Sequence, residues 1–386
     1  MQAPALILLA MLLACRSGQS PAGEGLTHSA QDSGMPASDA AAEGKPADGG
    51  TFPEPELEII ATGLDVPWGM DLLPNGQLLV AERNGRITRI DPSTGKQTEL
   101  ARRPALNQGE GGLLGMVLDP EFAGGGGGGA FPYLYLYETT PEGNRIVRMR
   151  LEGDVLSEDQ VLLTGIPKAR YHNGGVIRFG PDGYLYAGTG DGRDPFSAQD
   201  PNSLGGKVLR MTRDGAAVEG ISLVYSLGHR NIQGLAWDAE GNLYATEHGP
   251  SGEINGWCCH DEVNRIVQGG NYGWPHVIGD QTREGCLLPL AHSGEATWAP
   301  GGCAVLRGSG WGPLEGHLIT AGLRGQHLQL FDLKTGKTSA IWFQNSLGRL
   351  RNVLLGPDGS VYFCSSNRDG RGRSQDGDDK IYRVKP

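Results

Sequence analysis

Two polar residues flank one predicted β-hairpin at positions that suit acid–base chemistry. His172 lies in the segment YHNGG just before a short apolar run, and Asp191 follows the next run, in GTGDG. If the two runs pair as antiparallel strands, both side chains return to the same end of the hairpin. An imidazole held in one tautomer by a carboxylate is a common form of general base. The pair alone is weak evidence, because a loop histidine is more often a surface or capping residue.

A second group of residues supports a site at the same end of the fold. It contains four arginines that stand in loops beside predicted strands: Arg230 with Asn231 beside it, Arg324, Arg349 and Arg351. Arginines that converge on an acidic chain favour an anionic ligand, because guanidinium groups pair in a bidentate manner with carboxylates. For any one arginine alone, the commoner role is to anchor a loop through backbone carbonyls.

The elements that would position these residues repeat along the chain. A glycine-centred turn precedes an alternating strand four times, at residues 74–80, 181–187, 239–245 and 357–363. Such turns commonly lead into a strand of a hairpin. The first and last turns are 283 residues apart, which corresponds to five steps of about 57 residues. Two further units are therefore expected in the long gaps, and residues 132–137 and 313–320 fit them.

A second repeated pattern gives the same number of units. Six segments alternate with one apolar face and are interpreted as strands at the rim of each unit: residues 86–90, 145–149, 207–211, 262–266, 327–331 and 380–384. The sequence therefore predicts an all-β fold, a six-bladed β-propeller of four-stranded antiparallel blades, over residues 53–386. Residues 57–61 would pair with the last blade and close the ring. The alternative is an open array of β-sandwiches.

The composition agrees with a fold rich in turns and argues against some partners. The 386 residues include 63 glycines, about twice the usual share. Six of them, residues 124–129, are consecutive and are interpreted as a surface loop, because no helix follows that would complete a phosphate site. The net charge of −11 argues against nucleic-acid binding, which needs a basic surface.

The N-terminal segment is interpreted as an export signal. The apolar run at residues 6–13 has the length of a signal core and is too short to span a bilayer. It ends in LLAC, which resembles a lipoprotein cleavage box, so residues 1–15 are predicted to be a signal with Cys15 as the lipidated residue. We expect an exported protein tethered in the periplasm or at the outer membrane, or a secreted one if Cys15 is not lipidated. Residues 16–52 lack large apolar side chains and predict a disordered linker.

Five cysteines follow Cys15. Disulfides are expected in an exported protein. The bridge favoured by position joins Cys286 to Cys303 across one inserted loop. Cys258 and Cys259 are adjacent, so a bond between them would lie below the usual Cα separation for a disulfide; a role in electron relay is an alternative. Cys364 lies within a predicted strand and is expected to be a buried free thiol.

Several stretches taken together, in order, resemble one known family. They are GLDVPWGMDLLPNG, GEGGLLGMVLDPEF, YHNGGVIRFGPDG, GTGDG, GHRNIQGLAW, EHGP and DEVNRI followed by GGNYGWP. The chain resembles, over residues 57 to 384, the soluble glucose/sorbosone dehydrogenases that use pyrroloquinoline quinone (PQQ) and are also called aldose sugar dehydrogenases. The resemblance implies an exported enzyme that oxidises an aldose at C1 to its lactone, with PQQ and Ca²⁺ as cofactors. An external electron acceptor, such as a quinone, dye or cytochrome, would complete the cycle.

The resemblance also implies a role for each candidate residue. His172 would be the general base that takes the proton of the C1 hydroxyl as hydride passes to PQQ, and Asp191 would orient it and lie near the sugar. Arg230 would stand beside the reactive carbonyl of PQQ. The other implied cofactor contacts are Asn231, Thr297, Arg324, Arg349 and Arg351. Gly249 and Pro250 would offer backbone carbonyls to calcium, which prefers oxygen ligands and would act as a Lewis acid.

Two departures from the family's pattern affect the expected substrate. Glu110 stands where the family usually has a glutamine near the sugar. Residues 251–260 form a longer segment than usual between Pro250 and Asp261, and this segment would border the cleft. The identity of the sugar is therefore the least constrained part of the interpretation.

Two other functions are compatible with the sequence. A calcium-dependent propeller lactonase or other hydrolase would need several carboxylates around the channel, and these cannot be assembled from the motifs. A non-catalytic binding propeller would have lost the cofactor, but the two residues whose loss would favour it, His172 and Arg230, are both present. Reconstitution with PQQ and calcium, followed by dye reduction with aldoses, separates the three functions.

Overall fold

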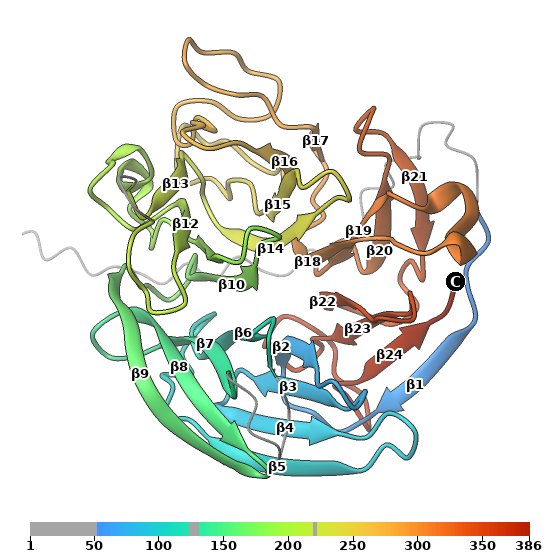
Figure 1. Cartoon of the computed structure of the whole chain (residues 1–386). Helices are drawn as coiled ribbons and strands as arrows, with labels where there is room; N and C mark the ends of the chain where they lie inside the picture. Colours follow the sequence, from blue (N-terminus) through green and yellow to red (C-terminus); the bar gives the residue numbers. More distant parts are fainter. Residues whose placement is uncertain (1–51, 123–130, 219–221) are drawn as a thin grey trace, which may run out of the picture. The chain divides into compact units, whose positions relative to one another are not determined.

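Six four-stranded sheets surround a common axis in the computed structural model (Figure 1). The structure describes residues 52–122, 131–218 and 222–386. The strand pairings within these sheets are antiparallel, so the predicted six-bladed β-propeller is confirmed. The predicted signal, almost all of the predicted linker and the run of glycines at 124–129 lie outside the described residues.

The first three blades follow the chain from the inner strand outward. Blade one contains β2 (Pro67–Leu72), β3 (Leu78–Glu82), β4 (Arg86–Ile90) and β5 (Gln97–Arg102). Blade two contains β6 (Leu113–Leu118), β7 (Tyr133–Thr139), β8 (Asn144–Glu152) and β9 (Val155–Ile166). Blade three contains β10 (Gly174–Phe179), β11 (Leu185–Thr189), β12 (Lys207–Met211) and β13 (Val224–Leu227), with the 3-10 helix η1 (Pro195–Gln199) after β11.

The last three blades repeat this order, with one exception at the end of the chain. Blade four contains β14 (Ile232–Trp237), β15 (Leu243–Glu247), β16 (Glu262–Ile266) and β17 (Ala291–His292). Blade five contains β18 (Pro300–Val305), β19 (Leu318–Gly322), β20 (His327–Phe331) and β21 (Thr338–Trp342), with the 3-10 helix η2 (Ser309–Leu314) after β18. Blade six contains β22 (Leu350–Leu355), β23 (Val361–Ser365), β24 (Ile381–Val384) and, as its outermost strand, β1 (Leu57–Ala61).

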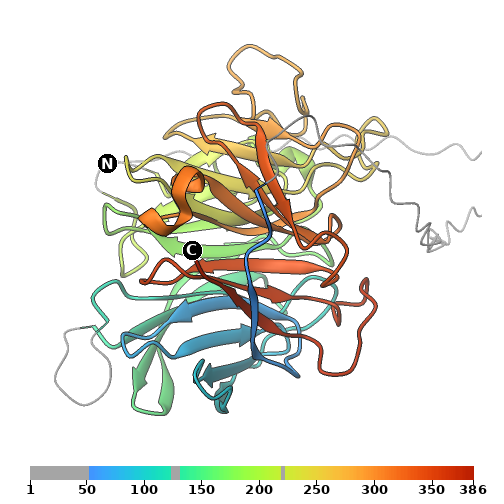
Figure 2. The same ribbon diagram turned by 90° about the vertical axis from the view of Figure 1, so that its right-hand side faces the viewer.

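Strand β1 closes the ring as predicted. It pairs with β24 in the register Leu57 to Val384 and Ile59 to Tyr382. Figure 2 shows β1, in blue, lying beside the red strands of the last blade. The two ends of the folded domain are therefore held in one sheet, so opening the propeller at this blade requires the loss of a complete strand pairing.

The repeated alternating strands were placed wrongly within the blades. Each of them is the third strand of its blade, and a fourth strand lies outside it. The fourth strands have no shared pattern: β5 and β9 are largely exposed, and β17 has only two residues. Such strands carry little periodic signal because only part of one face contacts the rest of the protein. Residues 313–320 are also only partly a strand, since Pro313 lies in η2 and β19 begins at Leu318.

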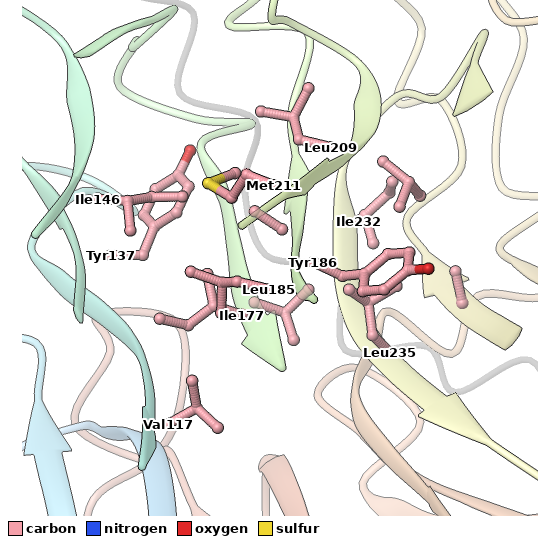
Figure 3. Packing of buried hydrophobic residues seen from close by; sticks show 14 of the residues in the cluster. Val117, Tyr137, Ile146, Ile177, Leu185, Tyr186, Leu209, Met211, Ile232 and Leu235 are labelled. Atoms are coloured by element: carbon pink, nitrogen blue, oxygen red, sulfur yellow. The ribbon is translucent and has the colours of Figure 1, made fainter. Parts of the chain in front are cut away.

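The core lies between neighbouring blades. Figure 3 shows one such region between blades two, three and four, where Tyr137, Ile177, Leu185 and Ile232 contribute side chains that are fully buried. Burial of apolar surface of this kind stabilises a fold by roughly 25 cal/mol per Å². Near the axis the inner strands approach so closely that only glycine fits: a Cβ on Gly301 would lie 1.8 Å from the carbonyl oxygen of Arg351.

The cysteines differ from the prediction in one respect. The expected bridge between Cys286 and Cys303 is wrong, since both are free, and the structure has a disulfide between Cys258 and Cys259 instead. Cys303 is buried in β18 against Gly234 of the neighbouring blade, whereas Cys286 lies beside Gly273 in the loop before β17. Cys364 is a buried free thiol, as expected. Within the described residues, no helix has the length and apolar character needed to cross a membrane.

Candidate active site

The predicted general base, His172, and Asp191 form a hydrogen-bonded pair. His172 precedes β10 and Asp191 follows β11, and the imidazole Nδ1 lies 2.8 Å from Asp191 Oδ1. Asp191 is fully buried, and its second oxygen accepts a hydrogen bond of 2.9 Å from the indole of Trp274. The backbone amide of Arg193 donates to the first oxygen at 2.8 Å. Three donors thus hold the carboxylate in place behind the imidazole.

The other imidazole nitrogen faces Arg230. The Nη2 group of this arginine lies 2.8 Å from His172 Nε2. A guanidinium group can only donate hydrogen bonds, so Nε2 accepts the bond with its lone pair and carries no proton. The proton of the ring is then on Nδ1, where it is donated to Asp191. This tautomer is the one a general base needs, with its accepting nitrogen directed toward a cationic side chain.

Arg230 is fixed from both its backbone and its side chain. Its amide donates to Glu247 Oε2 at 2.9 Å, and Nη1 donates to the carbonyl of His248 at 3.2 Å. Its Nε forms a salt bridge with Glu253, which belongs to the inserted segment 251–260. His229 and Asn264 occupy the other oxygen of Glu247. The insertion therefore reaches the reaction centre itself, not only the edge of the cleft.

Two arginines of blade six, the buried Arg351 and the partly buried Arg349, share one carboxylate. Arg349 Nε and Arg351 Nη2 lie 2.8 Å and 3.3 Å from the same oxygen of Asp369. Burial lowers the pKa of both guanidinium groups, although Asp369 opposes this effect. Arg83 of blade one also lies close enough to lower the pKa of Arg351, and its own buried Nε has no partner in the described structure. The positive charge of this region exceeds the negative charge that is paired with it.

A half-buried histidine lies among these groups, and its buried Nε2 atom is unsatisfied. Asn231 Nδ2 lies 3.4 Å from His248 Nδ1, whereas His248 Nε2 has no hydrogen-bond partner among the described residues. Burial lowers the pKa of His248 to about 4, with smaller effects of Asp261, Glu110, Arg230 and Arg351. A buried polar atom without a partner is costly. We infer that a bound molecule supplies its partner.

Three other predicted residues lie in different environments. Asn231 is buried, and its carbonyl oxygen accepts from the amide of Gly174 at 3.0 Å. The hydroxyl of Thr297 donates to Asp261 Oδ2 at 2.9 Å. The side chain of Arg324 is exposed, and no carboxylate among the described residues lies within 4.0 Å of it. Thr297 is thus already engaged, whereas Arg324 is available to an anion.

Glu110 holds the backbone of the base in place. Its Oε2 accepts from the backbone amide of His172 at 3.1 Å, and its Oε1 lies 3.3 Å from Arg371 Nη1. Burial alone would raise the pKa of Glu110, but Arg371, His248 and the His172 amide together hold it below its usual value. Glu110 is therefore an ionised carboxylate beside the base. The glutamine that the family usually has at this position would be neutral.

The two residues expected at the metal offer main-chain oxygens only. The amide of Gly249 donates to Asp261 Oδ1 at 2.9 Å, and the carbonyl of Pro250 accepts from Cys259 at 2.9 Å. Within the described residues, no group of three or more His, Cys, Asp or Glu side chains could hold a metal ion. An ion at Gly249 and Pro250 would thus need further ligands from a bound molecule.

Sequence reasoning missed several residues of this site. Arg83 and Asp369 lie outside the motifs that the repeat emphasised, and each follows the second strand of its blade, β3 and β23. Glu253 and Arg371 lie in loops without any repeated pattern; the sequence placed the segment that holds Glu253 beside the cleft but did not predict its contact with Arg230, and it gave no position for Arg371. Trp274 was within a recognised motif, yet its contact with Asp191 spans 83 residues of sequence. Long-range contacts of this kind depend on how the blades close around the axis.

Comparison with known proteins identifies the family. The family model for glucose/sorbosone dehydrogenases matches residues 64–381. The chain belongs to the glucose/sorbosone dehydrogenase family. The PQQ-bound aldose sugar dehydrogenase of Streptomyces coelicolor is 40% identical, with a TM-score of 0.76, and the alignment covers 87% of this chain and 99% of that one.

Two further members of this glucose/sorbosone dehydrogenase group extend the comparison. A Thermus thermophilus protein, provisionally assigned as a glucose dehydrogenase, is 42% identical, with a TM-score of 0.77, over 86% of this chain and all of that one. Quinoprotein glucose dehydrogenase B of Acinetobacter calcoaceticus is 32% identical over 58% of this chain and 53% of its own length. The family resemblance inferred from the motifs is therefore confirmed.

Proposed function

We propose that this glucose/sorbosone dehydrogenase oxidises an aldose at C1 to its lactone, with PQQ as the electron acceptor. One observation carries the proposal: the lone pair of His172 Nε2 and the guanidinium group of Arg230 meet at 2.8 Å, beside a buried region with surplus arginine charge. A base and a cation at one point suit the removal of a proton from a hydroxyl while the developing charge on oxygen is stabilised.

The residues around the channel fit PQQ, which carries three carboxylates. Arg349 and Arg351 share a single carboxylate partner, and Arg83 has an unsatisfied Nε close to them. His248 Nε2 is a second unsatisfied buried atom in the same region. Guanidinium groups suit planar carboxylates, and Arg324 is a further exposed candidate. When bound, PQQ supplies the two-electron acceptor for hydride from C1.

The protein's own part in the reaction is proton transfer and positioning. His172 takes the proton of the C1 hydroxyl at Nε2, which the hydroxyl reaches by replacing the hydrogen bond from Arg230. The imidazolium that forms is stabilised by Asp191, which already accepts a hydrogen bond from Nδ1–H. Arg230 is then free to orient the substrate oxygen. The Asp191 carboxylate has its three hydrogen bonds before substrate binds, so little reorganisation is needed.

Calcium is proposed to be held at the carbonyls of Gly249 and Pro250. Calcium takes six to eight oxygen ligands, more than these two carbonyls provide. The remaining ligands would come from PQQ and water. If so, PQQ and calcium each need the other, and the metal should bind weakly to the protein without PQQ.

The proposed location of the enzyme rests on the first residues of the chain. We propose export through the segment 1–15 and a membrane tether at lipidated Cys15 in the periplasm or at the outer membrane, with secretion as the alternative. An exported enzyme would pass its electrons to an external quinone or cytochrome, or to a dye in an assay. Mass determination of the mature N-terminus tests this part of the proposal.

Reconstitution tests the proposed activity. Apoprotein is mixed with PQQ in the presence of calcium or of a chelator, and the absorbance of the quinone and the reduction of a dye are followed with a panel of aldoses. We expect activity only with both cofactors, and its loss in His172→Asn with PQQ still bound. No dye reduction and no absorbance change would indicate a binding propeller, whereas cleavage of lactones without PQQ would indicate a hydrolase.

A further inference from the structure

Three arginines gather around one tyrosine, which directly precedes His172 in the chain. The guanidinium carbons of Arg170, Arg193 and Arg371 lie 5.5, 6.0 and 5.0 Å from the centre of the Tyr171 ring. They come from three separate loops, before β10, after β11 and between β23 and β24. We call these four residues the basic rim. Stacking of guanidinium groups on an aromatic ring orients them but does not neutralise their charge.

Hydrogen bonds connect the basic rim to the catalytic pair. Tyr171 directly precedes His172 in the chain. The backbone amide of Arg193 donates to Asp191 Oδ1 at 2.8 Å. Arg371 is 3.3 Å from Glu110, whose other oxygen accepts from the His172 amide at 3.1 Å. The backbone at Tyr171 and Arg193 and the Arg371 side chain are therefore held close to the imidazole that accepts the proton.

The charge of the rim is only partly compensated. Glu110 pairs with Arg371, whereas no carboxylate among the described residues lies within 4.0 Å of Arg170 or Arg193. This contrasts with partly exposed arginines on the third strands of the blades, such as Arg148 and Arg383, which have carboxylate partners. Keeping two unpaired cations together has an electrostatic cost that a bound anion would remove. On a chain of net charge −11, such a cluster marks a local site for an anion.

The rim differs from the region proposed for PQQ. Arg349 and Arg351 are nearly buried and are held by Asp369. Arg170 and Arg193 are exposed and adjoin His172 and Glu110, where a substrate has to present its reacting hydroxyl. An anion at the rim would thus be attached to the substrate, not to the cofactor.

We propose that the basic rim binds an anionic group on the substrate, so that the preferred aldose carries a carboxylate or phosphate at C6. In a hexopyranose the ring separates C6 from C1, so the anion can lie between Arg170 and Arg193 while C1 faces His172. Guanidinium pairs recognise carboxylate and phosphate alike. This inference rests on the proposed oxidation at C1 and extends it to the class of sugar.

The first test compares three sugars that differ only at C6. We expect kcat/KM for D-glucuronate or D-glucose 6-phosphate to exceed that for D-glucose at low ionic strength, and the advantage to fall as salt is added. Which of the two anions is preferred distinguishes a carboxylate site from a phosphate site. Equal kcat/KM for all three sugars would overturn this proposal, whereas the proposed oxidation of an aldose at C1 would still stand.

Variants locate the effect at the rim. In the double variant Arg170→Gln with Arg193→Gln we expect kcat/KM for the preferred anionic sugar to fall about tenfold or more, with kcat/KM for glucose within about twofold of wild type. Arg193→Lys, which keeps the charge, should retain most of the preference. The control is Arg102→Gln on the outer strand β5, an exposed arginine paired with Glu99. An equal loss of kcat/KM for the anionic sugar in Arg102→Gln would refute the assignment of the effect to the basic rim.

A binding measurement separates this inference from the proposed activity. Calorimetric titration of apoprotein with D-glucuronate, without PQQ or dye, should show binding that weakens in the double variant. If the reconstituted protein oxidises no sugar but this binding persists, the proposed oxidation fails and the rim remains an anion site. If the double variant instead loses affinity for PQQ and keeps its selectivity among sugars, the rim serves the cofactor and the inference is wrong.

Discussion

Replacement of Asp191 by asparagine perturbs the base His172, although the asparagine side chain has nearly the same shape as that of aspartate. The carboxylate receives three donors: His172 Nδ1 and the Arg193 amide on one oxygen, and the Trp274 indole on the other. Asparagine has one acceptor oxygen and one amide group, so it cannot serve both sides. If the oxygen faces His172, the amide meets the Trp274 donor. If the oxygen faces Trp274, the amide meets His172 and forces its proton onto Nε2, where the base is blocked.

The size of the effect follows from these contacts. With the oxygen toward His172, the imidazolium loses a charge-assisted hydrogen bond of about 1.5–3 kcal/mol, which lowers kcat by one to two orders of magnitude. The other orientation produces the wrong tautomer and lowers kcat further. The opposed donors at Trp274 destabilise the folded state by about 1–3 kcal/mol, because both groups are buried.

The assay uses reconstituted enzyme and a second variant. Dye reduction gives kcat, titration of the quinone absorbance shows that cofactor affinity is unchanged, and urea unfolding gives stability. Trp274→Phe removes the donor that opposes the asparagine amide, so Asp191→Asn should cost less stability in that background than in wild type. A kcat within twofold of wild type in Asp191→Asn, or equal stability losses in both backgrounds, would refute the assignment of Asp191 as the group that orients the base.

Three other perturbations have expected outcomes. Glu253→Gln removes a negative charge beside Arg230, so PQQ, an anion, should bind several-fold more tightly in an absorbance titration, and weaker binding would contradict this arrangement. Gly301→Ala places a Cβ 1.8 Å from the Arg351 carbonyl, and we expect it to lower the free energy of unfolding by at least about 2 kcal/mol and to weaken PQQ binding. Burial lowers the pKa of His327 from 6.5 to about 4, so the unfolded chain takes up a proton first and stability falls as pH drops from about 6.5 to 4. His327→Gln should flatten this part of the stability profile, by at most about 3 kcal/mol, relative to wild type at the same pH; an unchanged profile would refute it.

The sequence predicted the fold because its signal repeats. Turn residues such as Gly76, Gly183 and Gly359 have positive φ angles, which few other residues adopt without strain, so each turn is visible in the sequence. The second and third strands are apolar on a regular face and were found in all six blades. The outermost strands carry no such pattern, and their position had to come from the structure.

The site was predicted only in part, for a different reason. His172, Asp191 and Arg230 stand directly beside recognisable strands, so their common location followed from the strand directions. Arg371 comes from a loop that reaches another blade at Glu110, whereas Glu253 pairs with Arg230 within blade four; both contacts depend on loop paths that no periodicity encodes. The cysteine prediction failed similarly, because distance along one loop said nothing about Cys303 facing the neighbouring blade.

The distribution of the site over the ring connects cofactor binding to closure of the propeller. Arg83 lies in blade one, His248 in blade four and Arg351 in blade six, on both sides of the junction that β1 closes. Across that junction Asn352 Nδ2 donates to the carbonyl of Trp68 at 2.6 Å. The surplus positive charge of Arg83 and Arg351 repels across the same boundary when no anion is present. A tricarboxylate bound there would replace this repulsion with attraction. Cofactor binding is therefore expected to stabilise the closed ring at the boundary between blades six and one.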